Sequence, residues 1–290
     1  MTIPASAPTP RPTAKGRSSL VTGFTFLRYA PRAHTLHARL EAGRSNRRAR
    51  VGEDALVRRP ALVTLATVSV WTVGGLWLDG HVDRTGQLLL GVLTAAVLAA
   101  LLSLHSPAVR LQTLAVVGIA TVGEVVGSLI WGLYVYRLDN LPAFVPPGHG
   151  LVYLGGLSLA TLVASRPGVL LWVAAVGAAV WGALGLTVLP ATDVSGAIGC
   201  TFLVAVLLRT RRPVYAGVFL VVAALELYGT AVGTWTWEGT VPGLGLAQGN
   251  PPSGVASGYV VFDVLALALV ASPLRARAVA QVRRLRSVST

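Results

Sequence analysis

The chain has 290 residues, of which 53% are hydrophobic and only 12% are charged. Because a soluble domain carries about 25% charged residues, this composition excludes an ordinary soluble enzyme and favours membrane spans of about 20 residues each. The net charge of +13 is concentrated at the chain ends: residues 1–60 hold Lys15 and eleven Arg, and the tail from residue 272 holds five Arg. Basic ends around an apolar body follow the positive-inside rule, so no nucleic-acid partner is expected.

The first segment, residues 1–58, is rich in Pro, Ala, Ser and Arg and has no apolar run long enough for a signal peptide. We interpret it as a disordered, basic cytoplasmic arm. The basic tail, residues 274–290, is expected on the same side of the membrane. Both ends are expected to contact anionic lipid headgroups.

Eight apolar runs follow the arm, and the loops between them alternate in charge. The basic loops carry no acid, whereas the acidic loops carry only two Arg, so the basic loops belong with the basic termini. The sequence therefore predicts an all-α, polytopic transmembrane helical bundle of about eight spans in the lipid bilayer of a bacterial inner membrane, with both termini cytoplasmic. The runs are 61–78, 86–104, 112–136, 148–165, 168–189, 194–208, 213–235 and 255–273; the basic loops hold Arg110, Arg166, Arg209, Arg211 and Arg212, and the acidic loops hold Asp79, Asp83, Asp139, Asp193 and Glu238.

The two halves of the chain share an ordered series of residues. Glu124 recurs as Glu226 (226 − 124 = 102), and each is followed by a Gly three residues later and a small hydroxyl residue four residues later. Two alternating aromatics and a Pro-Pro pair continue both series. We interpret 59–165 and 166–273 as parallel four-helix repeats, because an even number of spans returns the chain to the same side. Chance matching in a Gly-rich chain is the alternative.

The strongest candidate catalytic residues are Glu124 and Glu226. Glu124 is expected about 18 Å below Tyr136 along the helix, near the bilayer midplane, where a carboxylate costs at least about 2.5–3.5 kcal/mol. The small residues beside each Glu predict that the third and seventh spans face each other and bring the two carboxyls together. A pair that shares one site is expected to keep at least one proton. A structural hydrogen bond between helices is the alternative reading for each Glu.

Further candidates flank the fourth and eighth spans. His149 opens the fourth span with Tyr153 one turn below, and Tyr259 and Asp263 are one turn apart in the eighth. His149 and Asp263 are candidate catalytic residues, whereas Tyr153, Tyr259 and Asn250 are candidate substrate-binding residues. A hydrogen bond from His149 to a loop carbonyl is the competing interpretation. No span carries two ligands at i and i+4, so no metal site is predicted, and the sequence identifies no cofactor.

Four aromatic residues are expected at the outer ends of the two Glu helices. They would line a site for an apolar ligand, or they would form an ordinary interfacial aromatic belt. They are Tyr134, Tyr136, Trp235 and Trp237.

The motif around Glu124 resembles part of the bacterial carotenoid cyclase and hydratase-like membrane proteins. The pattern is Glu124-x-x-Gly127, Gly132-x-Tyr134-x-Tyr136, Pro142 and Val145-Pro146. The resemblance implies that a neutral Glu protonates an isoprenoid double bond and that aromatic faces stabilise the resulting cation. The Asn250-Pro251-Pro252-Ser253-Gly254 loop departs from that pattern. The chain is also similar to uncharacterised bacterial multipass membrane proteins, a likeness that implies no activity.

Three functions therefore remain open at the level of sequence. The first is a membrane enzyme that binds an isoprenoid or lipid substrate at an intramembrane Glu pair. The second is a proton-coupled transporter or channel, which midplane acids in parallel repeats also fit. The third is a non-catalytic membrane scaffold.

Overall fold

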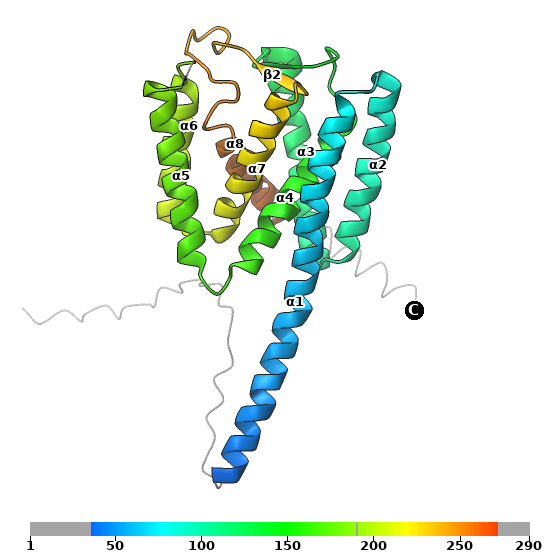
Figure 1. Ribbon diagram of the computed structural model, residues 1–290, viewed down its shortest axis with the longest axis vertical. Coiled ribbons are helices and arrows are strands. Elements are labelled where there is room, and N and C mark those ends of the chain that lie inside the picture. The colour runs from blue at the N-terminus through cyan, green and yellow to red at the C-terminus, as the bar shows by residue number, and fades with distance from the viewer. Residues whose placement is uncertain (1–35, 190, 272–290) are drawn as a thin grey trace, which may run out of the picture. The chain divides into compact units, whose positions relative to one another are not determined.

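The computed structural model describes the backbone of residues 36–189 and 191–271, and the side chains of 57–189 and 191–270. Helices dominate this part of the chain, with two short strands between them (Figure 1). The elements are α1 (Leu36–Asp79), α2 (Arg84–Ser103), α3 (Pro107–Glu124), the π-helix η1 (Val125–Trp131), β1 (Tyr134–Tyr136), α4 (Val145–Leu162), α5 (Pro167–Thr187), α6 (Val194–Thr210), α7 (Pro213–Ala231), β2 (Trp235–Trp237) and α8 (Ser257–Ala271).

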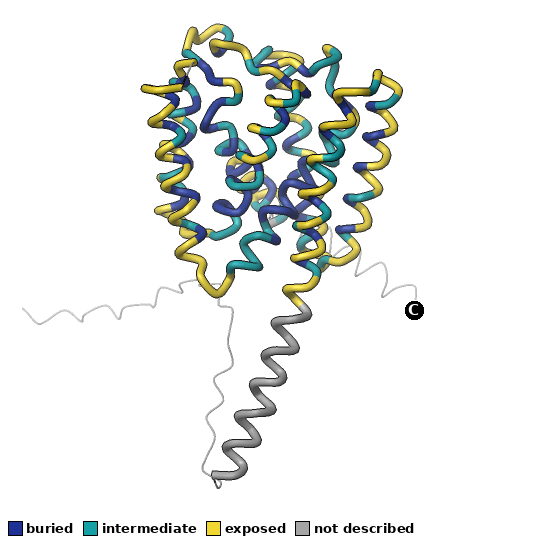
Figure 2. Tube along the Cα trace, viewed as in Figure 1, coloured by how far each residue is buried: buried dark blue, intermediate teal, exposed yellow. Residues whose placement is uncertain are grey.

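Within the described part of the chain, five helical segments are long and apolar enough to cross a membrane. They are Val57–Asp79, Arg84–Ser103, Pro107–Trp131, Pro167–Thr187 and Pro213–Ala231. Val194–Thr210 and Ser257–Val270 are shorter apolar helices. The exposed faces of the outer helices are themselves apolar (Figure 2), for example at Leu88, Leu89, Val92 and Leu93 on α2 and at Val169, Trp172, Val173 and Val176 on α5. The prediction of a helical, multi-span membrane protein is confirmed at this level.

The first helix differs from the expected arm. We predicted disorder through residue 58, whereas α1 begins at Leu36. Between residues 36 and 58 the sequence is rich in Leu, Ala, Glu and Arg, which are strong helix formers, and this composition outweighs its low hydrophobicity. Residues 1–35 and the predicted tail, 274–290, lie outside the described residues.

Turn signals in the sequence mark where several helices begin. Pro stands in the first turn of α3, α5 and α7, where its missing N–H leaves no hydrogen bond unmade. Asp83 accepts the Gly86 N–H at the start of α2, and Asp193 accepts the Gly196 N–H at the start of α6.

Helix α4 lies at the centre of the bundle. It packs against α2, α3 and α7, while α3 also packs against α8, and α5 packs against α6 and α7. Gly156 and Gly217 let α4 and α7 cross in backbone contact, since a Cβ at Gly217 would overlap the Gly156 carbonyl. The third and seventh helices were expected to face each other; α3 and α7 make no substantial direct helix–helix contact, and α4 contacts both of them.

The two Glu-bearing helices end earlier than predicted. Gly132 and Gly233 have φ of 74° and 75°, a left-handed conformation that L side chains disfavour, and there the chain turns back. The following strands β1 and β2 pair in an antiparallel ladder, with Tyr134 opposite Trp237 and Tyr136 opposite Trp235. The estimate that Glu124 lies about 18 Å below Tyr136 is therefore wrong, because it assumed a continuous helix.

Candidate functional site

Glu124 is held by the strand that follows it in the chain. Tyr134 and Tyr136 donate their hydroxyls to Oε2 of Glu124 at 2.6 and 2.7 Å. Alternate residues of a strand share one face, so both rings reach the same oxygen. Burial raises the pKa of both tyrosine hydroxyls, and the Glu124 charge raises it further. Both hydroxyls therefore remain protonated and act as donors.

Glu226 has a parallel arrangement with indole donors. Nε1 of Trp235 and Nε1 of Trp237 donate to its Oε2 at 2.9 and 3.1 Å. Gly229 makes room for this arrangement, because a Cβ there would overlap the Trp235 ring. No donor among the described residues reaches the other oxygen, Oε1.

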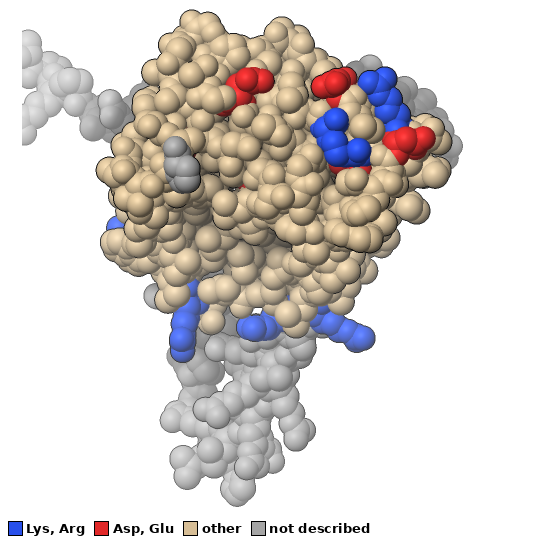
Figure 3. Space-filling view, turned by 45° about the horizontal axis from the view of Figure 1, so that its top comes forward, with Lys and Arg blue, Asp and Glu red and all other residues tan. Residues whose placement is uncertain are grey.

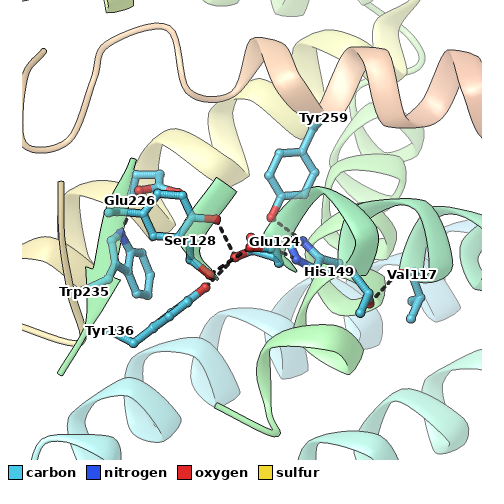
Figure 4. Close-up of polar contacts among 10 residues, drawn as sticks. Val117, Glu124, Ser128, Tyr136, His149, Glu226, Trp235 and Tyr259 are labelled. Atoms are coloured by element: carbon cyan, nitrogen blue, oxygen red, sulfur yellow. Dashed lines mark hydrogen bonds and ion pairs between the residues drawn. The ribbon is translucent and has the colours of Figure 1, made fainter. Parts of the chain in front are cut away.

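His149 joins Glu124 to the last helix (Figure 4). Its Nε2 lies 3.2 Å from Oε1 of Glu124, although the two atoms are not aligned for a hydrogen bond. Its Nδ1 lies 2.8 Å from the Tyr259 hydroxyl. Glu124, His149 and Tyr259 thus lie in a row of titratable side chains beside the cavity, and residues of these types serve in general acid–base catalysis.

Both carboxyls line one cavity of about 290 Å³. They are close enough for the charge of Glu124 to act on Glu226. Apolar and aromatic side chains form most of the wall, which suits an apolar ligand oriented by a few polar groups. The lining includes Trp71, Leu76, Leu90, Phe144, Leu151, Val152, Leu225, Val255 and Phe262.

Most of the predicted site residues meet at this cavity. The eight that line it are Glu124, Glu226, His149, Tyr134, Tyr136, Trp235, Trp237 and Tyr259.

The other three predicted residues lie away from the cavity lining. Asp263 accepts a hydrogen bond from Gln112 Nε2 at 2.9 Å, and Tyr153 lies within reach of the Asp263 charge. The side-chain oxygen of Asn250 accepts the backbone N–H of Trp237 at 3.1 Å, so Asn250 supports strand β2.

Sequence reasoning missed the contribution of the first two helices. Trp71 on α1 donates to Thr94 on α2 at 3.0 Å, and both residues line the cavity. Thr94 is one of few polar residues in its apolar run, and that is the only signal in the sequence. Among the described residues, no group of three or more His, Cys, Asp or Glu side chains could hold a metal ion.

Comparison with known protein families, with curated proteins and with solved structures found no match for this chain. Its fold and its buried site define a helical protein of membrane type with two carboxyls at an internal apolar cavity.

Proposed function

We propose that this protein is a membrane enzyme that binds an isoprenoid or another apolar lipid in the cavity and acts on it by acid–base catalysis. The observation that carries the proposal is the placement of Glu124 and Glu226 at one apolar cavity, each held by two aromatic donors. Buried carboxyls with fixed partners are costly in a membrane and are typical of functional sites.

The two carboxyls take different roles in this proposal. Glu124 receives two hydroxyl donors and lies beside His149, which suits a carboxylate. Glu226 has donors on Oε2 alone, and its Oε1 suits the acidic proton.

The proposed reaction moves one proton onto the substrate and one off it. A proton passes from Glu226 to one carbon of a double bond and leaves a carbocation, which the aromatic faces stabilise. A neighbouring carbon then loses a proton to Glu124, giving an isomerised or cyclised product, and proton exchange within the site restores Glu226. This chemistry agrees with what the resemblance to carotenoid cyclase and hydratase-like proteins implies.

The proposal includes eight spans arranged as two parallel repeats. Its support is the β1–β2 register, in which Val135 faces Thr236 and the residues on either side pair symmetrically about them. The equivalent glycines Gly132 and Gly233 also share one left-handed conformation. Such matching is expected for repeats related by an axis along the membrane normal.

The proposed location is a bacterial inner membrane with both termini in the cytoplasm. In the view of Figure 3, the charged side chains at the lower end of the described bundle are basic, whereas the acidic side chains lie at the opposite end with some basic side chains beside them. This separation supports a cytoplasmic lower end that contacts anionic headgroups.

The test is deuterium incorporation. The full chain in lipid nanodiscs is incubated in D₂O with a panel of acyclic isoprenoid hydrocarbons, which are then analysed by mass spectrometry. We expect carbon-bound deuterium in at least one compound with the wild type and none with Glu226→Gln. Absence of deuterium from the whole panel would contradict the proposal.

Proton-coupled transport is a second candidate function, favoured by a separate observation. A second group of buried polar side chains comes from four helices. Its members are Gln112 on α3, Tyr153 on α4, Tyr215 on α7 and Asp263 on α8. Arg212 lies 3.3 Å from the Tyr215 hydroxyl at the start of α7. Proton flux across liposomes that contain the wild type, and its loss in Asp263→Asn, would favour transport. If neither proton flux nor substrate turnover is observed, a non-catalytic membrane scaffold is the remaining function.

A further inference from the structure

The cavity carries acidic groups without a strong basic partner. Glu124 and Glu226 line it, whereas no Lys or Arg is among the described residues that do so. The guanidinium of Arg137 is instead held outside the cavity by Asp79, and it donates to the carbonyls of Asp79 and Val82. Among the lining residues that the structure describes, His149 is the only basic side chain. An apolar ligand that brings its own positive charge is therefore complementary to this cavity.

One carboxyl oxygen at the cavity is available to such a ligand. Glu226 is only 7% exposed, yet both of its donors bind Oε2. Oε1 has no donor among the residues that the structure describes. Because Glu226 lines the cavity and no protein donor occupies Oε1, a ligand N–H can donate to this oxygen once the carboxyl is ionised.

The aromatic rings in the cavity wall also favour a cation. The Tyr134 and Trp237 ring centroids are 4.4 Å apart with the planes tilted by 45°, and the Tyr136 and Trp235 rings meet edge to face at 6.2 Å. All four rings line the cavity with the carboxyls. Aromatic faces beside a carboxylate are a recurring means of binding substituted ammonium groups.

We propose that the cavity binds an organic cation, with an ammonium group beside Glu124 and Glu226 and an apolar chain along the α1, α2 and α4 walls. The ammonium takes the position of the carbocation in the proposed reaction, and to that extent the inference rests on the proposed function. The evidence for cation binding, however, comes from the charge and geometry of the cavity. An anionic lipid is disfavoured at the same place, because its phosphate would lie beside two acids with no Arg or Lys.

Binding of two ligands that share a geranyl chain and differ in head-group charge tests this proposal. N,N-dimethylgeranylamine, which is protonated at neutral pH, and methyl geranyl ether, which is neutral, are titrated into the full chain in zwitterionic nanodiscs. Binding is followed by native mass spectrometry and by tryptophan fluorescence, since Trp235 and Trp237 line the cavity. We expect the amine to bind at least tenfold more tightly than the ether. Equal affinities would overturn the proposal.

Variants assign the selectivity to the carboxyls. Glu226→Gln keeps the shape of the side chain and should reduce amine affinity at least tenfold while leaving ether affinity unchanged; Glu124→Gln serves the same purpose if the first variant does not fold. Asp139→Asn is the matched control, because Asp139 is exposed at φ 51°, a conformation that Asn tolerates well. An equal loss in this control, or full amine affinity in both Gln variants, would refute the assignment.

The outcome is separable from that of the enzyme test. Selective amine binding without deuterium incorporation would keep the cation site and refute the proposed reaction. Deuterium incorporation with no preference for the amine would support the proposed reaction and refute the cation site.

Discussion

Tyr136 and Trp235 lie opposite each other in the β1–β2 ladder, yet their side chains bind different carboxyls. Tyr136 donates to Glu124, and Trp235 donates to Glu226. The neighbouring pair behaves in the same way, since Tyr134 donates to Glu124 and Trp237 to Glu226. The ladder register therefore fixes both carboxyls at once. A slip of one residue in either strand would turn the two rings of that strand to the other face.

Replacing either carboxyl should separate chemistry from stability. Glu124→Gln and Glu226→Gln keep an acceptor for the aromatic donors and should fold normally, while catalytic activity is lost and amine affinity falls. Glu226→Leu leaves the two indole N–H groups without an acceptor and should destabilise the fold by about 1 kcal/mol, the scale of a hydrogen bond between membrane helices. Thermal unfolding in nanodiscs measures the stability of each variant, and the deuterium assay measures its activity. Full activity in the Gln variants would show that the carboxyls are only structural.

Gly229→Ala should disturb the site without removing any functional group. The new Cβ would overlap the Trp235 ring, so the ring must move away from Glu226. We expect a loss of about 1–3 kcal/mol, typical of overpacking, together with a shift in tryptophan fluorescence. Gly118→Ala on α3, where a Cβ meets nothing within 4 Å, is the control and should leave both properties unchanged. Equal effects in the two variants would contradict the proposed role of Gly229.

Two exposed glycines test the orientation. Gly168 and Gly239 are both exposed and have open space around a new Cβ. In a Cys200→Ala background, Gly239→Cys should react with a membrane-impermeant maleimide in intact cells, and Gly168→Cys only after lysis. The opposite pattern would invert the topology.

Asp263 should behave differently from the cavity carboxyls. Asp263→Asn keeps an oxygen for Gln112 and should preserve stability, whereas Asp263→Leu leaves the buried Gln112 amide with only its long contact of 3.4 Å to the backbone carbonyl of residue 263 and should cost about 1 kcal/mol. Amine binding in the cavity should survive in Asp263→Asn. Its loss would place Asp263 in the ligand site.

Apolar run length and loop composition predicted most of the helices, because both report local physics. Helix α5 begins at Pro167 and α7 begins at Pro213, because proline suits the first turn of a helix. The repeated motif also identified Glu124 and Glu226 as candidates, and the fold brings both residues to one cavity.

The chain reversals at Gly132 and Gly233 could not be predicted, because an isolated Gly in an apolar run is compatible with a continuous helix. Strand pairing between β1 and β2 joins segments about a hundred residues apart, and no local pattern specifies such a contact. The positions of Asp263 and Asn250 outside the cavity were missed for the same reason.

The most direct test of the central claim is mass spectrometry of apolar compounds that co-purify with the protein. Wild-type protein extracted in mild detergent should carry an isoprenoid, lipid or lipophilic amine close to one per chain. Gly148→Phe should purify without it, because Gly148 lines the cavity and has open space where the ring would enter. Equal amounts of the same compound in the wild type and in a folded Gly148→Phe variant would contradict binding in this cavity.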